Sequence, residues 1–139
     1  QFMGKATYAA PELVVGDVAH QNETTDIYAI GILFFQLIVG HLPFDGATHE
    51  VLDMQLHQKM PLQLVPQKQI KKIIGKATEK KQVKRYQSAA EFRVAVEQLD
   101  KVVSVNENNS KSITFISDFL HNKNILIGRS FAVTSCWSV

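Results

Sequence analysis

The sequence has few of the residues that build disulfide-stapled, fibrous or membrane-spanning proteins. Its single cysteine, Cys136, rules out an internal disulfide framework and favours a reducing compartment such as the cytoplasm. Seven glycines and four prolines among 139 residues are too few for a collagen-like or low-complexity chain. The most apolar stretch, Ile27 to Val39, contains Gln36 and is shorter than the ~20 residues that a membrane-spanning helix needs. We therefore expect one soluble, folded domain.

The charges and histidines favour no nucleic-acid or metal partner. The net charge is only +2, and the five histidines lack the spacing of metal ligands. Basic residues are crowded into one region, at Lys68, Lys71, Lys72, Lys76, Lys80, Lys81, Lys84 and Arg85. A nucleic-acid surface is one interpretation, but no aromatic residues interleave with these lysines to stack bases. The solvated face of an amphipathic helix is the favoured interpretation.

The central helix is expected to be buried on all sides. Thr24, Thr25 and Asp26 offer capping oxygens and a negative charge where a helix begins, and Gly40 supplies a stop. The helix between them, from Ile27 to Val39, is apolar almost all round, which is typical of a helix surrounded by protein.

The remaining segments predict shorter helices. Residues 1–22 read as loop with a short helix after Pro11, and a helix is expected from Thr48 to His57. Ser88 and Glu91 have the spacing of a capping box, in which the carboxylate reaches back to the amide of Ser88. Two helices carry one apolar stripe each, formed by Ile70, Ile73, Ile74 and Ala77, and by Phe92, Ala95, Val96, Leu99 and Val103.

The character of the chain changes after residue 103. Residues 104–112 predict a polar linker, and residues 113–139 a tail without a clean period. Within this tail we expect a short helix near Ser117 to His121 and a strand near Ile125 to Gly128.

Three motifs occur in a fixed order along the chain. They are Gly4-Lys5-Ala6-Thr7-Tyr8-Ala9-Ala10-Pro11-Glu12, then Asp26-Ile27-Tyr28-Ala29-Ile30-Gly31, and finally Arg85-Tyr86-Gln87-Ser88. Together they resemble the second half of a eukaryotic-type (Hanks-type) serine/threonine protein kinase domain, with a bacterial-like last motif. The resemblance implies a mainly helical large lobe over residues 1–103, without the N-terminal lobe and catalytic loop.

The resemblance also implies roles for particular residues. Gly4, Lys5, Ala6 and Tyr8 would belong to the loop that positions the protein substrate. Structural roles would fall to Pro11, Glu12, Asp26, Gly31 and Arg85. Glu12 would form a buried ion pair with Arg85, and Asp26 would fix the backbone of the catalytic loop. The plainer alternatives are a helix cap for Asp26 and two unrelated surface charges for Glu12 and Arg85.

The sequence departs from the family pattern in two ways. Lys5 stands where the serine/threonine branch usually has threonine, whose hydroxyl bridges catalytic groups. No Gly-x-Gly, His-Arg-Asp or Asp-Phe-Gly motif is present, so we expect no catalytic residue, and no ATP, magnesium or other cofactor site, in this chain. A complete parent would use ATP and Mg²⁺.

Two alternatives to an enzyme fragment remain. The alternatives are a pseudokinase-type protein-binding module and, more weakly, a basic helical nucleic-acid binder. Because the chain starts with Gln1 and the motifs follow at once, we expect the first part of the domain to be missing. Helix 27–39 would then lack part of its cover, and the isolated chain would be only marginally stable.

Overall fold

The computed structural model describes residues 5–101 and 107–121 of the chain. Within these ranges the structure contains helices and turns but no strand, as expected for a mainly helical lobe. None of the described helices is both long enough and apolar enough to cross a membrane. In chain order the elements are η1 Ala6–Tyr8, α1 Pro11–Val14, η2 Val18–His20, α2 Glu23–Val39, α3 Thr48–His57, η3 Leu62–Leu64, α4 Lys68–Ala77, η4 Gln82–Lys84, α5 Ala89–Glu97, η5 Gln98–Lys101 and α6 Glu107–His121.

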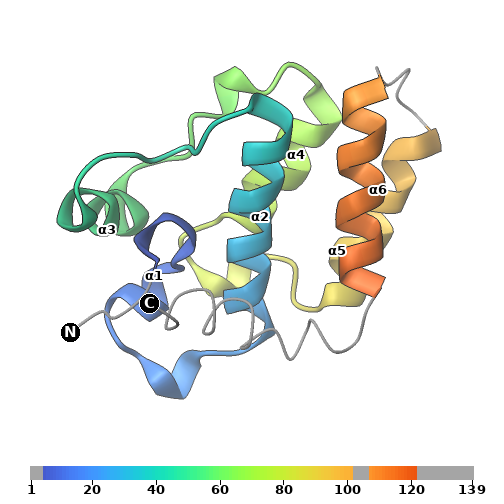
Figure 1. The fold of residues 1–139 in the computed structure, drawn as a ribbon. Coiled ribbons are helices and arrows are strands. Elements are labelled where there is room, and N and C mark those ends of the chain that lie inside the picture. The colour runs from blue at the N-terminus through green and yellow to red at the C-terminus, as the bar shows by residue number, and fades with distance from the viewer. Residues whose placement is uncertain (1–4, 102–106, 122–139) are drawn as a thin grey trace.

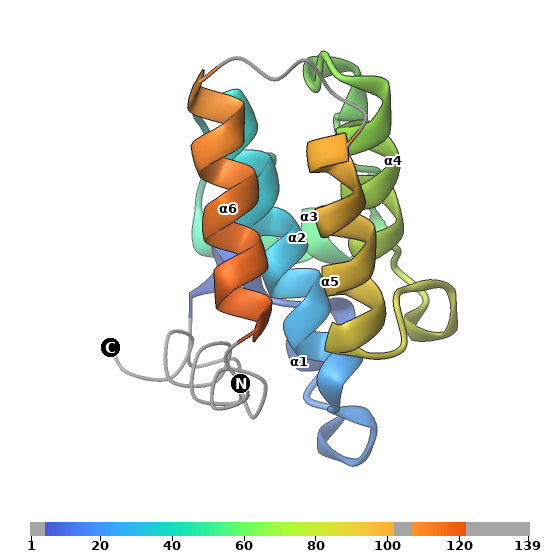
Figure 2. The ribbon, with the colours of Figure 1, turned by 90° about the vertical axis from the view of Figure 1, so that its right-hand side faces the viewer.

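Helix α2 stands at the centre of the molecule, and the other helices pack around it (Figure 1). Helices α4, α5 and α6 contact it on one side, and η1 contacts it on another. Figure 2 shows α6 running beside α2 and α5. Ile30, Phe34 and Phe35 are among the α2 side chains that are completely or almost completely buried. The prediction of a helix surrounded by protein is therefore confirmed for most of its length, whereas Leu37 in the last turn is 41% exposed.

Helix α2 begins earlier than the sequence predicted. Its cap is Asn22, whose side-chain oxygen accepts a hydrogen bond from the Thr24 amide at 2.8 Å. The Thr25 hydroxyl oxygen in turn accepts from the Asn22 amide at 3.1 Å, which completes a capping box. The expected capping residues therefore lie inside the first turn. The predicted stop is confirmed, because Gly40 adopts φ +93° and its amide bonds to the carbonyl of Gln36.

Most of the shorter helices have the expected bounds. Helix α1 begins at Pro11, and α3 spans the predicted Thr48–His57. In α5 the Ser88 hydroxyl accepts from the Glu91 amide at 3.1 Å. The Glu91 carboxylate, however, accepts from the amide of Gln87 at 2.8 Å rather than from that of Ser88. The carboxylate of Glu91 therefore binds the amide one residue before the one that was predicted.

After residue 103 the expected linker was wrong over residues 107–112, whereas the helix expected near Ser117 to His121 is present but begins earlier. Helix α6 covers Glu107–His121, so most of the expected linker and the short helix near its end are parts of one long helix. Ile113, Ile116 and Leu120 are buried and lie three and four residues apart, which places them on one face. This apolar face outweighs the turn-forming asparagines and serines. The strand expected near Ile125 and the stripe residue Val103 lie outside the described residues.

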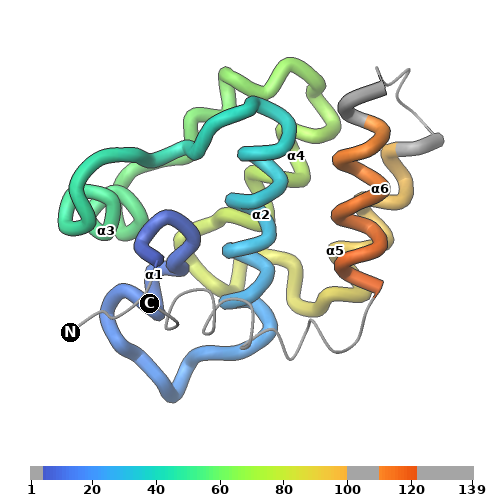
Figure 3. The backbone as a smooth tube through the Cα atoms, in the orientation of Figure 1, coloured from blue at the N-terminus to red at the C-terminus, as the bar shows by residue number. Residues whose placement is uncertain are grey.

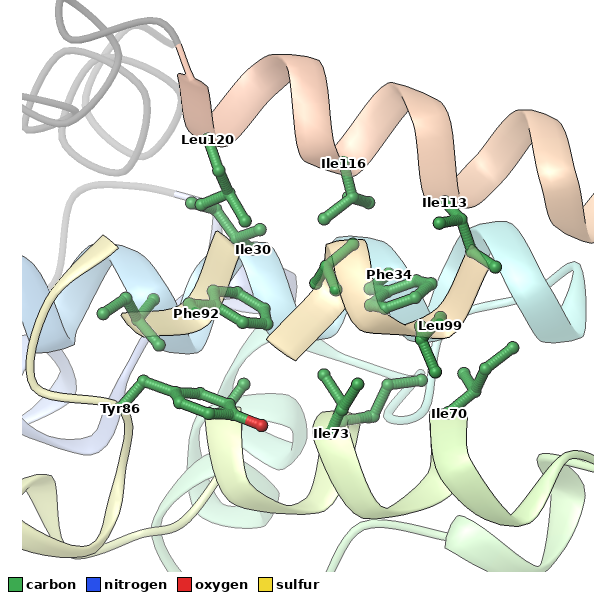
Figure 4. Packing of buried hydrophobic residues seen from close by; sticks show 14 of the residues in the cluster. Ile30, Phe34, Ile70, Ile73, Tyr86, Phe92, Leu99, Ile113, Ile116 and Leu120 are labelled. Atoms are coloured by element: carbon green, nitrogen blue, oxygen red, sulfur yellow. The ribbon is translucent and has the colours of Figure 1, made fainter. Parts of the chain in front are cut away.

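The core lies between four helices. Figure 4 shows the α6 side chains meeting Ile30 and Phe34 of α2 and Phe92 of α5, with the α4 stripe on the opposite side. The rings of Tyr86 and Phe92 stack with their centroids 4.9 Å apart. All four predicted α4 stripe residues are buried. In the second stripe Phe92, Val96 and Leu99 are buried, whereas Ala95 is only partly so.

Candidate functional site

The segment from Lys5 to Ala10 forms a short loop that is packed against the helical body. The tube in Figure 3 shows η1 lying between α2 and α3, and η1 contacts both of these helices. Ala6, Ala9 and Ala10 are buried, whereas Lys5 is exposed. Small side chains allow this close approach of the loop backbone. Gly4, the first predicted residue of the loop, lies outside the described residues.

Gln55 of α3 holds the loop by its backbone. Its side-chain amide donates to the carbonyl oxygens of Ala6 and Thr7 at 3.1 and 3.0 Å. The amide oxygen of Gln55 accepts from the hydroxyl of Tyr28 on α2. Gln55 is fully buried, so leaving either end unpaired would cost about 1–3 kcal/mol. Gln55 was not among the predicted site residues, and its only signal in the sequence is a polar residue on the buried side of an otherwise amphipathic helix.

Tyr8 makes a second attachment between the loop and α2. Its hydroxyl donates to the side-chain oxygen of Gln36 at 2.6 Å. Burial raises the pKa of Tyr8, and the hydrogen bond to Gln36 opposes this effect to a smaller extent. Tyr8 therefore stays protonated and keeps donating throughout the neutral range.

The end of the loop is fixed by a buried ion pair. Glu12 lies in α1, directly after Pro11, and Arg85 lies between η4 and α5. Nη1 and Nη2 of Arg85 donate to the two carboxylate oxygens of Glu12 at 2.7 and 3.0 Å. Glu12 is 7% exposed and Arg85 only 1%. The pair expected from the resemblance is thus present, in the two-pronged geometry that arginine favours.

The remaining donors of Arg85 bind three backbone carbonyls. Nε donates to the carbonyl of Glu79 at 2.7 Å, Nη1 to that of Thr24 at 2.9 Å, and Nη2 to that of Lys80 at 3.2 Å. With the two bonds to Glu12, every N–H group of the guanidinium has a partner. Arg85 therefore ties α1, the start of α2 and the turn after α4 to one point.

Pro11, Asp26 and Gly31 occupy positions that suit structural roles. Pro11 stands in the first turn of α1, where its missing N–H is not needed. Asp26 lies in the first turn of α2 and is buried. A Cβ atom on Gly31 would lie 2.7 Å from Cγ2 of Thr78 and 2.9 Å from Cβ of Ala77. Glycine is therefore required there because α2 and the end of α4 are in close contact.

The arrangement can hold a peptide-sized loop rigidly, but the described residues show no assembled metal centre. No group of three or more His, Cys, Asp or Glu side chains in residues 5–101 and 107–121 is placed to hold a metal ion. What the site provides is an exposed Lys5 and a half-buried Tyr8 on a loop whose backbone is fixed from behind by α2, α3 and the ion pair.

The sequence is similar to those of known proteins. The sequence matches the protein kinase domain family over residues 1–125. It is 32% identical over 111 residues to the serine/threonine-protein kinase PrkC of Bacillus subtilis, covering 76% of this chain and 17% of that protein. It is 31% identical over 105 residues to a probable serine/threonine-protein kinase of Clostridium perfringens, covering 71% of this chain and 15% of that protein.

A shorter match reaches higher identity. The eukaryotic translation initiation factor 2-alpha kinase 1 of Schizosaccharomyces pombe is 55% identical over 40 residues, which cover 27% of this chain and 6% of that protein. The chain thus spans less than a fifth of the length of each of these relatives.

Proposed function

Because the chain belongs to the protein kinase family, we propose that it is the substrate-side part of a serine/threonine protein kinase. The complete enzyme would transfer the γ-phosphoryl group of ATP to serine or threonine hydroxyls of protein substrates. Three observations support the assignment of this region: the fixed loop from Lys5 to Ala10, the ion pair that anchors it, and the similarity to two bacterial serine/threonine-protein kinases, one of them a probable kinase.

The observation that carries the proposal is the attachment of the loop at both ends. Gln55 binds the backbone near its start, and Glu12 with Arg85 fixes the chain just beyond its end. Phosphoryl transfer depends on holding the acceptor hydroxyl in line with the donor, so a rigid loop beside the acceptor lowers the barrier by positioning. In our proposal the exposed Lys5 and the half-buried Tyr8 receive the substrate peptide, while the buried Ala6 between them keeps the loop against the helical body.

The chemical groups for the transfer itself would come from outside this chain. The sequence contains neither the Gly-rich loop nor the catalytic and metal-binding motifs that hold ATP and Mg²⁺ in kinases. We therefore propose that the 139 residues alone have no phosphotransferase activity. A cytoplasmic protein substrate is the partner we propose, since the single cysteine suits a reducing compartment.

One residue favours a second candidate, a pseudokinase-type binding module. Lys5 stands where the resemblance leads us to expect threonine, and it is exposed at the entrance to the loop. An ammonium group cannot accept a hydrogen bond as a hydroxyl can.

Nucleic acid is not our proposed partner, because the lysine-rich helix α4 uses its apolar stripe for the core and its lysines have no interleaved aromatic residues.

The proposal is tested by phosphorylation assays on two proteins. The 139-residue chain, mixed with Mg²⁺, ATP and myelin basic protein, should incorporate no phosphate above a protein-free blank. A longer protein that includes the region encoded upstream should phosphorylate the same substrate. Activity of the short chain would contradict our proposal of inactivity. An upstream region without the catalytic motifs, and without ATP binding, would favour the binding module.

The role of Lys5 is tested in the longer protein. Lys5→Thr should raise kcat by roughly ten-fold or more if the hydroxyl is the missing positioning group, since a positioned acid–base or hydrogen-bonding group contributes about 10²–10⁴ in rate. Lys5→Ala is the matched control, because it removes the cation without supplying a hydroxyl. Equal kcat values for the two variants would contradict this role.

A further inference from the structure

Lys80 lies in an unusual environment for a lysine. It follows α4, and its side chain reaches back toward two aromatic rings. Its Nζ is 4.9 Å from the ring centroid of Phe44 and 5.5 Å from that of Tyr28. The same nitrogen donates to the hydroxyl of Tyr28 at 3.0 Å and to the carbonyl of Met54 at 3.3 Å. The ammonium group is thus held by a phenol oxygen, a carbonyl oxygen and ring faces.

A second cation shares this environment. The guanidinium carbon of Arg85 lies 4.9 Å from the centroid of the same Tyr28 ring, while the carboxylate of Glu12 is taken up by the Arg85 fork. Burial first, and then the charge of Arg85, lower the pKa of Lys80 from 10.5 to about 8. At pH 8 roughly half of this amine is then neutral, compared with about 0.3% for a lysine of ordinary pKa.

Lys80 also borders an open cavity of about 340 Å³. The apolar part of its wall includes Met60 and Leu62, and its charged residues are Lys59, Glu79 and Lys80 itself. This volume lies within the range of small-molecule sites. A small reagent that enters this cavity therefore reaches Lys80. Desolvation together with a neighbouring cation is also how enzymes activate lysine as a nucleophile.

We propose that Lys80 is a site of covalent acylation that accepts the acyl group of a small activated carboxylate, such as an acyl thioester, entering through this cavity. The neutral Nζ attacks the thioester carbonyl carbon, a C–N bond forms and the C–S bond breaks. The proton released by the nitrogen passes through solvent to the departing thiolate. The products are an amide on Lys80 and a free thiol, with no oxidant or reductant consumed.

Acylation at this position is connected to the loop at the candidate site. Lys80 Nζ donates to the Tyr28 hydroxyl, that hydroxyl donates to Gln55, and Gln55 binds the carbonyls of Ala6 and Thr7. Turning the ammonium into a neutral amide removes the strongest donor at the start of this chain of hydrogen bonds. The modification would loosen the loop. The acylation chemistry needs no kinase activity and does not rest on the proposed function.

The experiment uses the 139-residue protein and S-acetyl-N-acetylcysteamine, a small thioester. Acetylation of each lysine is followed by peptide mass spectrometry between pH 6.5 and 9.5. Lys59 is the internal control, because it borders the same cavity but is exposed. At pH 7.5 Lys80 should react roughly ten-fold faster than Lys59, and its rate should level off above pH 8. Equal or slower acetylation of Lys80 would overturn the proposal.

The connection to the loop is tested separately by amide hydrogen exchange. Lys80→Gln, which imitates the acylated side chain, should raise exchange at Tyr8 and Ala9 several-fold relative to the unmodified protein. Lys59→Gln is the matched control and should leave these amides unchanged. If Lys80 is acetylated quickly but Lys80→Gln exchanges like the control, the site stands and its effect on the loop is refuted.

Discussion

At the scale of single residues, Arg85 connects more separate segments than any simple ion pair would. Its charge is buried, which is unfavourable unless the partner carboxylate and the remaining N–H groups are all matched. Glu12 and the carbonyls of Thr24, Glu79 and Lys80 provide this match. The ion pair therefore mainly fixes how α1 and the turn after α4 are placed relative to each other, because all these bonds form only in this arrangement.

We predict that Arg85→Lys destabilises the protein by about 3–5 kcal/mol, because lysine keeps the charge but cannot bind both oxygens and three carbonyls. The measurement is urea unfolding followed by circular dichroism. The control is Lys76→Gln, which breaks the half-exposed bridge to Glu91 and should cost no more than about 1 kcal/mol. Similar losses for the two variants would contradict the buried-pair argument.

Lys80 gives a second residue-scale prediction, on pH. Below pH 8 the lysine is protonated in both states, and the folded protein bears the full cost of the buried charge. Between pH 8 and the ordinary pKa of 10.5 only the unfolded chain keeps the proton, so stability should rise with pH. Burial raises the pKa of Tyr28 and Tyr86, which would lower stability only above about pH 10. The effect of Lys80 on stability is therefore measured between pH 8 and pH 10, below the range in which the tyrosines act.

The test compares urea unfolding of the protein with that of Lys80→Met across this window. The variant should lack the rise in stability between pH 8 and 10, whereas Lys59→Met should retain it. A Lys80→Met protein with the same pH slope as the unmodified protein would show that another group is responsible.

At the scale of helices, close contact between α2 and α4 depends on Gly31. We predict that Gly31→Ala costs about 1–3 kcal/mol by overpacking, despite the better helix propensity of alanine. The control is Gly75→Ala in α4, whose Cβ would meet only the flexible end of Leu62 at 3.0 Å and should be neutral or stabilising by up to about 1 kcal/mol. Thermal unfolding measures both. Equal losses would mean that glycine is not required by the contact.

The helices also show which features a sequence reveals. Helix α3 and the stripe of α4 were predicted because periodic apolar residues and flanking turns are local signals. The start of α2 was missed because several residues that can cap a helix follow one another, and the hydrogen bonds of Asn22 with Thr24 and Thr25 make it the cap. Helix α6 was underestimated because its polar first turns resemble a linker. The ion pair came from family resemblance, whereas the Gln55 and Lys80 contacts join positions far apart in sequence and carry no local pattern.

At the scale of the whole molecule, α6 changes the expectation that the central helix would be left partly uncovered. Its buried face packs on α2 and α5, and residues such as Ile30 and Phe34 are enclosed (Figures 2 and 4). Most apolar residues of α2 therefore find their cover within this chain, although Leu37 in its last turn is 41% exposed. Because a domain is stable by only about 5–15 kcal/mol, this one helix can decide whether the isolated protein folds cooperatively.

We predict that Ile116→Ala costs about 2–5 kcal/mol, since it opens a cavity between α6, α2 and α5. It should also increase fluorescence of a hydrophobic dye, because α6 then detaches more often and exposes the core. Phe115→Ala is the matched control: Phe115 is adjacent on the same helix but 50% exposed, so its loss should cost less than about 1 kcal/mol and leave dye binding unchanged. Urea unfolding and dye fluorescence measure both variants. If Ile116→Ala were as mild as the control, α6 would be an accessory to the fold, and the central helix would have to be stabilised without it.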